Sequence, residues 1–220
     1  MAQTISERIV NAVRRATLVM RMKRTRKFLE IMKPGPQEVV LDVGGYHEMW
    51  RQSGYEGPLV CLNLETPERY KIFGQLPGNC RYVQGDARSL ELPDQSFDIV
   101  FSNSVIEHVG TWEDQHAFAR ETARVGKRYW IQTPNKHFPI EPHMNFPYFQ
   151  FLPRALQERL ALVWPLSYPR RDGYRGEEMK SVVRSIRLLT IKEMRELYPT
   201  GVLWQERFGP LVKSIVMYRR

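Results

Sequence analysis

The stretch Glu38–Gly45 reads E-V-V-L-D-V-G-G, a short apolar run that ends in an acid and two glycines. This pattern is typical of a buried parallel strand that leads into a tight turn beside a ligand. Gly44 and Gly45 lack a Cβ, so the backbone can turn sharply and a ligand can lie against it. Asp42 is expected at the carboxyl end of the strand, where open α/β sheets bind ligands. Glycine-rich turns also join ordinary strands and helices, so this stretch alone leaves both a cofactor site and a plain turn open.

Strand-like and helix-like segments alternate after Gly45. We expect further strands at 58–64, 80–83, 97–102 and 128–132, and helices at 47–53 and 112–125. Strands that alternate with helices predict a parallel sheet covered by helices on both faces.

The C-terminal segment predicts a different strand arrangement. Thr190 is expected to cap a helix that ends before Pro199. Two closing strands at 202–208 and 211–218 are separated by Gly209-Pro210, which predicts a hairpin. The predicted fold is therefore a single α/β domain: a doubly wound, Rossmann-like, mostly parallel seven-stranded sheet with an antiparallel C-terminal hairpin strand.

The basic charge is concentrated at the N-terminus. The net charge of the 220-residue chain is +9, and residues 1–33 hold nine basic and two acidic side chains. Ser6 could cap a helix that runs to Met32, with apolar residues at helical spacing. Such a helix could pack by its apolar side with a solvated basic face, contact anionic lipid or nucleic acid, or cover the active site as a lid. An arginine-rich, acid-poor amphipathic N-terminus also resembles an organelle transit peptide.

Cysteine content and hydropathy predict a cytoplasmic protein. The two cysteines, Cys61 and Cys80, lie in or beside apolar strand-like segments, so we expect buried free thiols and a reducing compartment. No apolar run approaches the roughly 20 residues that span a bilayer, and the N-terminus does not resemble a secretory signal.

Acids and amides follow several of the predicted strands, where the carboxyl ends of a parallel sheet share one edge. These residues are Asp42, Asn63, Glu65, Asp86, Asn103 and Ser104. A single acid at such a place could be a helix cap or a turn residue. Several at successive strand ends predict a ligand site.

A longer motif joins the third and fourth strands. Gly85-Asp86-Ala87 is followed by L-P-D-Q-S-F-D-I-V at 92–100 and S-V-I-E-H-V at 104–109. The run resembles the G-D-A…L-P-x-x-S-F-D-x-V…x-x-x-E-H pattern of class I S-adenosylmethionine-dependent methyltransferases with a type 11 methyltransferase domain. The resemblance covers about residues 36–135.

The resemblance implies S-adenosylmethionine as cofactor, S-adenosylhomocysteine as product, and a role for each matching position. The implied contacts are Gly44, Gly45 and Tyr46 along the methionine part, Asn63 with Leu64 and Glu65 at the ribose, Asp86 and Ala87 at the adenine, and Asn103 and Ser104 through their backbone. Within this scheme 1–33 is the basic helix, 34–135 the cofactor-binding core, 136–189 an acceptor-side insertion and 190–220 the closing helix and hairpin.

Two departures from the family pattern bear on cofactor binding. Tyr46 and Glu48 stand where the glycine-rich motif has glycines, and Asn63 stands where an acid usually holds the ribose. A non-catalytic binding protein with a degenerate cofactor site is therefore one alternative.

Histidines supply the candidate catalytic groups. A methyltransferase mainly aligns the acceptor with the methyl group, and needs a base only where the acceptor must lose a proton. His108, which follows the fourth strand, is the first candidate, with Glu107 to orient it; a structural histidine at a helix start is the alternative. His143 and Glu141 are candidates for contacting the acceptor. The set of His137, Glu141 and His143 matches no strong metal motif, so no metal is expected.

The insertion at 136–189 is rich in proline and aromatic residues, and residues 153–163 within it could form a helix. It could be a hydrophobic flap or an acceptor pocket, and an aromatic lining suits a small-molecule or glycan-like acceptor. A nucleic-acid methyltransferase is the less favoured alternative, because no N/D-P-P-Y/W segment follows the fourth strand. A nicotinamide-dependent dehydrogenase would need a G-x-G-x-x-G fingerprint, which is absent. The sequence predicts no particular oligomeric state.

Overall fold

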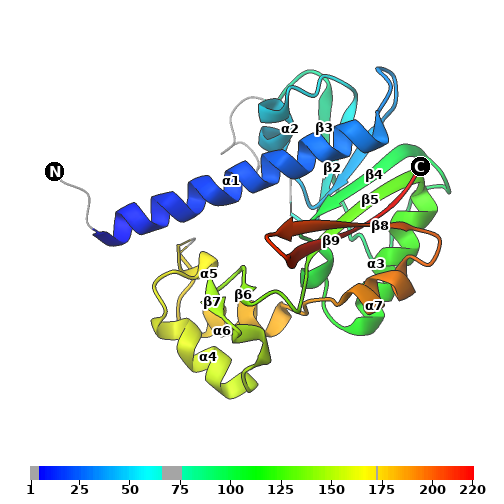
Figure 1. The fold of residues 1–220 in the computed structure, drawn as a ribbon. Coiled ribbons are helices and arrows are strands. Elements are labelled where there is room, and N and C mark those ends of the chain that lie inside the picture. Colours follow the sequence, from blue (N-terminus) through cyan, green and yellow to red (C-terminus); the bar gives the residue numbers. More distant parts are fainter. Residues whose placement is uncertain (1–4, 66–75, 172) are drawn as a thin grey trace.

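The computed structural model describes residues 5–65, 76–171 and 173–220, with side chains of the first helix described from Val19 onward. One seven-stranded sheet forms its centre, in the order β3-β2-β1-β4-β5-β9-β8 (Figure 1). The strands are β1 (Val40–Val43), β2 (Leu59–Asn63), β3 (Cys80–Gln84), β4 (Phe97–Asn103), β5 (Gly126–Pro134), β8 (Val202–Phe208) and β9 (Leu211–Arg219).

The first five strands are parallel, and β9 and β8 are antiparallel to their neighbours. The predicted doubly wound fold with a closing hairpin is thus confirmed. β1 lies at the centre, buried along its whole length, which explains why its sequence is an apolar run.

Helices cover both faces of the sheet. On one face, α3 (Trp112–Val125) and α7 (Ile191–Leu197) bury Phe118, Val125 and Met194 against the strands. On the other, α1 (Ile5–Met32) and α2 (His47–Ser53) contribute Phe28 and Trp50 to a second core. The sheet is therefore the middle layer of three (Figure 1).

Capping residues fix the ends of two helices. Thr111 and Thr190 each accept a hydrogen bond from a backbone N–H of the first turn, in capping boxes with Asp114 and Glu193. The predicted cap at Thr190 is confirmed. The predicted cap at Ser6 is wrong, because α1 already begins at Ile5; serine fits a first helical turn as well as a cap, and sequence patterns place helix ends only to within one or two residues.

The second half of α1 packs on the sheet. Phe28 is fully buried and makes edge-on contacts with the rings of Trp50, Phe101 and Trp130. Arg24 is also buried, with its guanidinium 3.7 Å from Glu206 on β8. The packed helix predicted from the sequence is confirmed for this half, although one of its arginines lies inside rather than in solvent.

The insertion forms a small subassembly of its own beside the sheet, below α1 in Figure 1. It contains β6 (Ile140–Glu141), β7 (Phe146–Pro147), the 3-10 helix η3 (Phe149–Phe151), α4 (Arg154–Val163), α5 (Tyr168–Arg171) and α6 (Gly176–Ser185). Met144, Phe149, Ala161, Met179 and Val183 form its buried centre. The predicted helix at 153–163 is confirmed as α4, whereas α6 was not predicted.

Two further findings concern the thiols and the membrane. Cys61 and Cys80 are buried and free, with their sulfur atoms 3.8 Å apart, as expected. Among the described residues, no helix combines the length and apolar character needed to cross a membrane.

We expect Phe28→Ala to lower the free energy of unfolding by about 3–5 kcal/mol, because it leaves a cavity among three aromatic rings. Lys23→Ala, at an exposed position of the same helix, is the matched control and should change stability by less than about 0.5 kcal/mol. Urea denaturation of the full chain measures both. Equal effects would mean that α1 does not belong to the core.

Candidate functional site

The carboxyl ends of the parallel strands meet at one edge of the sheet. The last residue of β1, Val43, pairs with Leu62 on one side and Ser102 on the other, and Asn63 pairs with Gln84. The turn after β1 therefore lies between the ends of β2 and β4. Its first amide, Gly44 N–H, donates to the carbonyl of Leu62 at 2.7 Å.

Both glycines of this turn are required by neighbouring side chains. Gly44 has φ +76°, and a Cβ there would lie 2.4 Å from Val105 Cγ2. A Cβ on Gly45 would lie 1.6 Å from Asp42 Oδ2. The sequence predicted that the missing Cβ atoms would admit a ligand. In the structure, Val105, which follows β4, fills the space beside Gly44, and the carboxylate of Asp42 fills the space beside Gly45.

Asp42 lies beneath the turn and is buried. Trp50 Nε1–H donates to its Oδ2 at 2.6 Å, and Oδ1 has no hydrogen-bond partner among the described residues. Burial raises the pKa of this carboxyl to about 7, although the Trp50 hydrogen bond acts in the opposite direction. Asp42 is thus placed to support the turn.

The predicted ribose residues follow β2. Asn63 Nδ2–H donates to the carbonyl of Gly45 at 2.9 Å, which ties the end of β2 to the turn. Leu64 is 65% exposed, and Glu65 is half-buried. Tyr46 precedes α2 in extended conformation and is exposed. These four residues border open surface at the carboxyl edge.

Asp86, predicted to meet the adenine, is held by an arginine that the sequence analysis did not single out. Arg88 donates from Nε to Oδ1 at 3.0 Å and from Nη2 to Oδ2 at 2.7 Å. These hydrogen bonds lower the pKa of Asp86, so it is a carboxylate at neutral pH. Arg88 also contacts Asp114 at 3.1 Å, and Ala87 between the pair is buried. The spacing of Asp86 and Arg88, two residues apart, was the available signal.

Asn103, expected just after the strand, is the last residue of β4, and Ser104 follows it and turns toward β5. It has φ +61°, and its backbone N–H donates to the carbonyl of Gln132 at 3.0 Å. Its hydroxyl donates to Gln132 Oε1, also at 3.0 Å. The amide of Ser104 is therefore already used within the protein. Within the described structure, the buried Nε2 of Gln132 has no hydrogen-bond partner.

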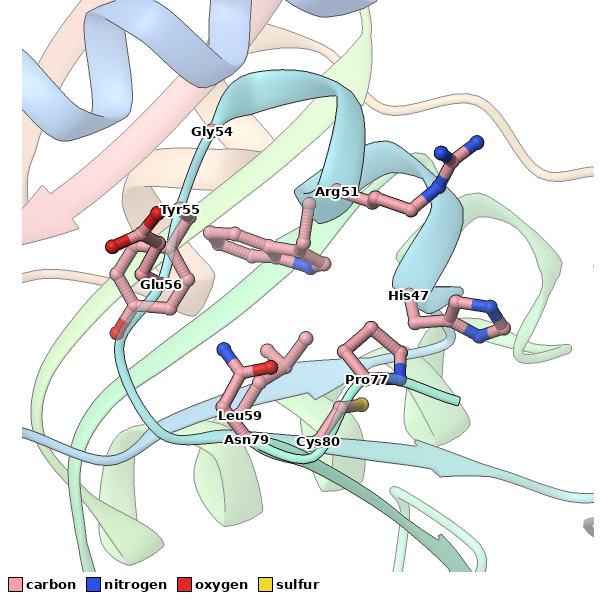
Figure 2. Close-up of a pocket in the computed structure, with 10 residues that line it drawn as sticks. His47, Arg51, Gly54, Tyr55, Glu56, Leu59, Pro77, Asn79 and Cys80 are labelled. Carbon is pink, nitrogen blue, oxygen red and sulfur yellow. The ribbon is translucent and has the colours of Figure 1, made fainter. Parts of the chain in front are cut away.

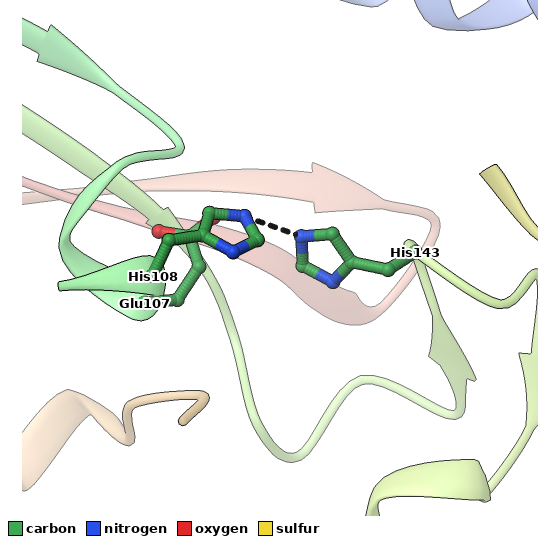
Figure 3. Close-up of side chains that lie close together, drawn as sticks. All are labelled: Glu107, His108 and His143. Atoms are coloured by element: carbon green, nitrogen blue, oxygen red, sulfur yellow. Dashed lines mark hydrogen bonds between the residues drawn. The ribbon is translucent and has the colours of Figure 1, made fainter. Parts of the chain in front are cut away.

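Two histidines predicted separately meet at this edge. His108 belongs to the 3-10 helix η2 (Ile106–His108), and His143 lies in the turn between β6 and β7. Their Nε2 atoms are 3.0 Å apart, and the rings are nearly perpendicular (Figure 3). His143 Nδ1 lies 2.5 Å from Glu141 Oε1. His137, close to His143 in sequence, is exposed and outside the metal-ligand cluster found among the described residues.

Glu107 lies beside the two rings (Figure 3) and is buried. Thr133 Oγ1–H donates to its Oε2 at 3.0 Å. Burial raises the pKa of Glu107, and the charge of His143 opposes this. For His143, burial lowers the pKa, but Glu141 and Glu107 together raise it above its ordinary value. Burial of the His108 ring lowers its pKa to about 3, and the charge of His143 lowers it further, although the residue as a whole is exposed.

One pocket lies away from this edge. It has a volume of about 290 Å³ and lies between α2 and the starts of β2 and β3, lined by residues that include Trp50, Tyr55, Leu59 and Cys80. Figure 2 shows it on the side of α2. Ligands of open α/β sheets bind at the carboxyl ends of the strands, so we assign the site to that edge and not to this pocket.

Comparison with known proteins finds a family model and relatives for part of this chain. Residues 42–129 match the family model described as "Methyltransferase domain". An uncharacterized protein of Mycobacterium tuberculosis, from two strains, is 27% identical over 108 residues. That alignment covers 47% of this chain and only 33% of the relative's length.

Solved structures share the fold. The magnesium protoporphyrin IX methyltransferase of Synechocystis, which was solved with bound S-adenosylhomocysteine, has a TM-score of 0.55 and 10% identity. The match covers 99% of this chain and 88% of that one. Phosphoethanolamine N-methyltransferase 2 of Haemonchus contortus gives a TM-score of 0.56 and 17% identity, over 86% of this chain and 39% of that one.

We expect Gly44→Ala to destabilise the protein more than Gly54→Ala does. Both glycines have φ near +75°, so both variants carry the same backbone strain, of roughly 1–2 kcal/mol. Only at Gly44 does the new methyl group meet a neighbour, Val105, which adds about 1–3 kcal/mol of overpacking. Thermal or urea unfolding compares the two variants. Equal losses would show that Val105 moves aside freely.

The raised pKa of Asp42 should make the free energy of unfolding depend on pH. Its pKa is about 7 when folded and 3.8 ordinarily, so the folded state binds more protons than the unfolded state between these values. Stability should therefore fall as pH rises from about 4 to 7, by on the order of 4 kcal/mol at most, and then level off. Asp42→Asn should remove this contribution, while Asp94→Asn, at an exposed acid, should not. Parallel wild-type and Asp42→Asn stability curves from pH 4 to 8 would contradict the assignment.

Proposed function

We propose that the chain is an S-adenosylmethionine-dependent methyltransferase of the type 11 family, and that it methylates an oxygen or nitrogen of a small-molecule or glycan-like acceptor. The main observation in support of an acceptor site is the contact between His108 and His143, which joins the expected cofactor-binding edge to the insertion. Val105, three residues before His108, packs against Gly44 of the turn. The histidine pair is therefore close in the chain to the expected methionine end of the cofactor.

The residues at the edge suit the cofactor. The carboxylate of Asp86 is fixed by Arg88 and can accept a hydrogen bond from the adenine amino group. The exposed Leu64 offers an apolar surface to a flat ring. Asn63 holds the turn through its amide nitrogen, so its oxygen is the atom that can accept from a ribose hydroxyl. Tyr46 occupies the N-cap position of α2 in extended conformation, so it follows the glycine turn and is not part of it.

The protein's part in the reaction is alignment. The cofactor, when bound, supplies an electrophilic methyl group on a sulfonium. The glycine turn and Asp86 would fix the two ends of that cofactor, while the insertion would hold the acceptor against the histidine pair. His108 and His143 can hydrogen-bond an acceptor hydroxyl or amine at the reacting atom. Phe146 and Trp164, whose rings contact each other edge-on at 4.9 Å, provide an aromatic element within the insertion.

The proposal is tested by methyl transfer. The full chain is incubated with methyl-labelled S-adenosylmethionine and separate pools of phenols, amines, oligosaccharides and RNA, and labelled product and S-adenosylhomocysteine are quantified. Labelled product from a phenol, amine or oligosaccharide pool supports the proposal. Transfer to RNA alone would replace it with the nucleic-acid alternative.

Asp86→Ala should weaken S-adenosylmethionine binding by about 1–3 kcal/mol, because the adenine amino group loses its partner. Asp94→Ala is the matched control, since Asp94 also pairs with an arginine, Arg124, but in the loop before β4. Isothermal titration of both variants makes the comparison. Unchanged affinity in Asp86→Ala would place the adenine elsewhere.

The remaining partner and compartment assignments stay predictions. The free, buried cysteines support a cytoplasmic location. Exposed Arg21, Lys23 and Arg26 on α1 support peripheral contact with an anionic membrane.

A further inference from the structure

The cluster of Glu107, His108 and His143 has a composition and geometry that methyl transfer from a sulfonium does not by itself require. One carboxylate oxygen and two imidazole nitrogens from these residues all lie within 4.8 Å of one another. They come from two separate parts of the chain, η2 after β4 and the turn between β6 and β7 (Figure 3). We propose that Glu107, His108 and His143 bind one divalent transition-metal ion.

The distance between the two rings fits a shared ion. Imidazole nitrogens bind zinc at about 2.0–2.1 Å, so two of them on one ion at angles of 90–110° are about 2.9–3.4 Å apart. The observed Nε2–Nε2 distance is 3.0 Å.

Glu141 fixes the orientation of one ring. Its Oε1 lies 2.5 Å from His143 Nδ1, so Nδ1 carries a hydrogen and donates it. Its Oε2 accepts from the backbone N–H of Met144 at 2.6 Å, which holds the carboxylate in place. In metal sites the ligating histidine commonly donates its second N–H to a carboxylate in this way.

Glu107 supplies an independent observation. Its side chain is fully buried, and Thr133 satisfies Oε2, but Oε1 has no hydrogen-bond partner among the described residues. A buried carboxylate oxygen without a partner costs free energy that a bound cation would remove. Arg24 is the nearest competing explanation, since its charge also influences Glu107. Its own buried Nε, however, has no hydrogen-bond partner in the described structure, so the two groups do not satisfy each other.

The chemical types of the three ligands restrict which metal ions can bind. Two imidazoles and a carboxylate suit Zn²⁺, Fe²⁺, Co²⁺ or Mn²⁺, whereas Mg²⁺ and Ca²⁺ prefer oxygen ligands. Three protein ligands leave coordination positions open, as in catalytic metal sites.

A role for the open positions rests on the proposed function. An acceptor hydroxyl bound to the ion would have a lowered pKa and would release its proton to water. The oxygen lone pair would then form the O–C bond, while the electron pair of the breaking C–S bond stays on sulfur. The metal site therefore favours oxygen over nitrogen as the methyl acceptor.

The test measures metal binding without cofactor or acceptor, so its failure is separate from failure of methyl transfer. The untagged full chain is stripped with a chelator and titrated with Zn²⁺, and with Co²⁺ for its absorption spectrum. We expect one ion per chain and a Co²⁺ spectrum of nitrogen and oxygen ligands, with no competition from Mg²⁺. The absence of stoichiometric binding in the wild type would overturn the proposal.

Metal binding by single-residue variants tests where the ion binds. Glu141→Gln should weaken binding about 10–100-fold, as is usual for a group that orients a ligand, and His143→Ala, His108→Ala and Glu107→Gln should weaken it further. His137→Ala and His116→Ala, at exposed histidines outside the cluster, should bind as the wild type does. Circular dichroism checks that each variant is folded. If one ligand variant fails to fold, the other two decide the result. Undiminished binding in the folded variants would place the ion elsewhere and contradict the site.

Discussion

The site depends on the reversal of the chain at Gly44 and Gly45. The turn is possible because neither residue has a Cβ: Val105 fills the space at Gly44, and the carboxylate of Asp42 fills it at Gly45. Asn63 holds the turn from the end of β2 through the carbonyl of Gly45. This one turn thus brings together residues of β1, of β2 and of the segment after β4. All the other groups of the site are positioned relative to these three.

The insertion completes the site from the other side. Pairing of β6 with β7 places Glu141 and His143 in one tight hairpin, and the hairpin brings the His143 ring to within hydrogen-bond distance of His108. Because Val105 and His108 are three residues apart, the glycine turn and the histidine pair belong to one continuous structure. A change in the position of the insertion would alter the acceptor side while leaving the parallel sheet intact.

The sheet was predicted well from the sequence, because the signals for its strands and turns lie within short stretches of the chain. The apolar run of β1, the alternation of elements and the Gly209-Pro210 turn each encode structure within a few residues, and the parallel and antiparallel directions of the strands followed. The order of the strands in the sheet was not predicted. The site was predicted only in part. Asp86 was identified, but Arg88, which holds it, was not. His143 was first grouped with its sequence neighbours His137 and Glu141, whereas in space its partners are Glu141, Glu107 and His108. His108 is 35 residues away from His143, and no periodicity in the sequence encodes a contact at that distance.

We propose that the carboxyl edge of β1, β2, β3 and β4 binds the cofactor, with its reacting end toward the histidine pair. A crystal structure of the full chain with S-adenosylhomocysteine tests this placement. We expect adenine beside Leu64 and Asp86, the methionine part along the turn at Gly44, and the sulfur atom facing His108 and His143. Density for the ligand in the pocket beside Trp50 and Tyr55, or with its sulfur directed away from the two histidines, would contradict it.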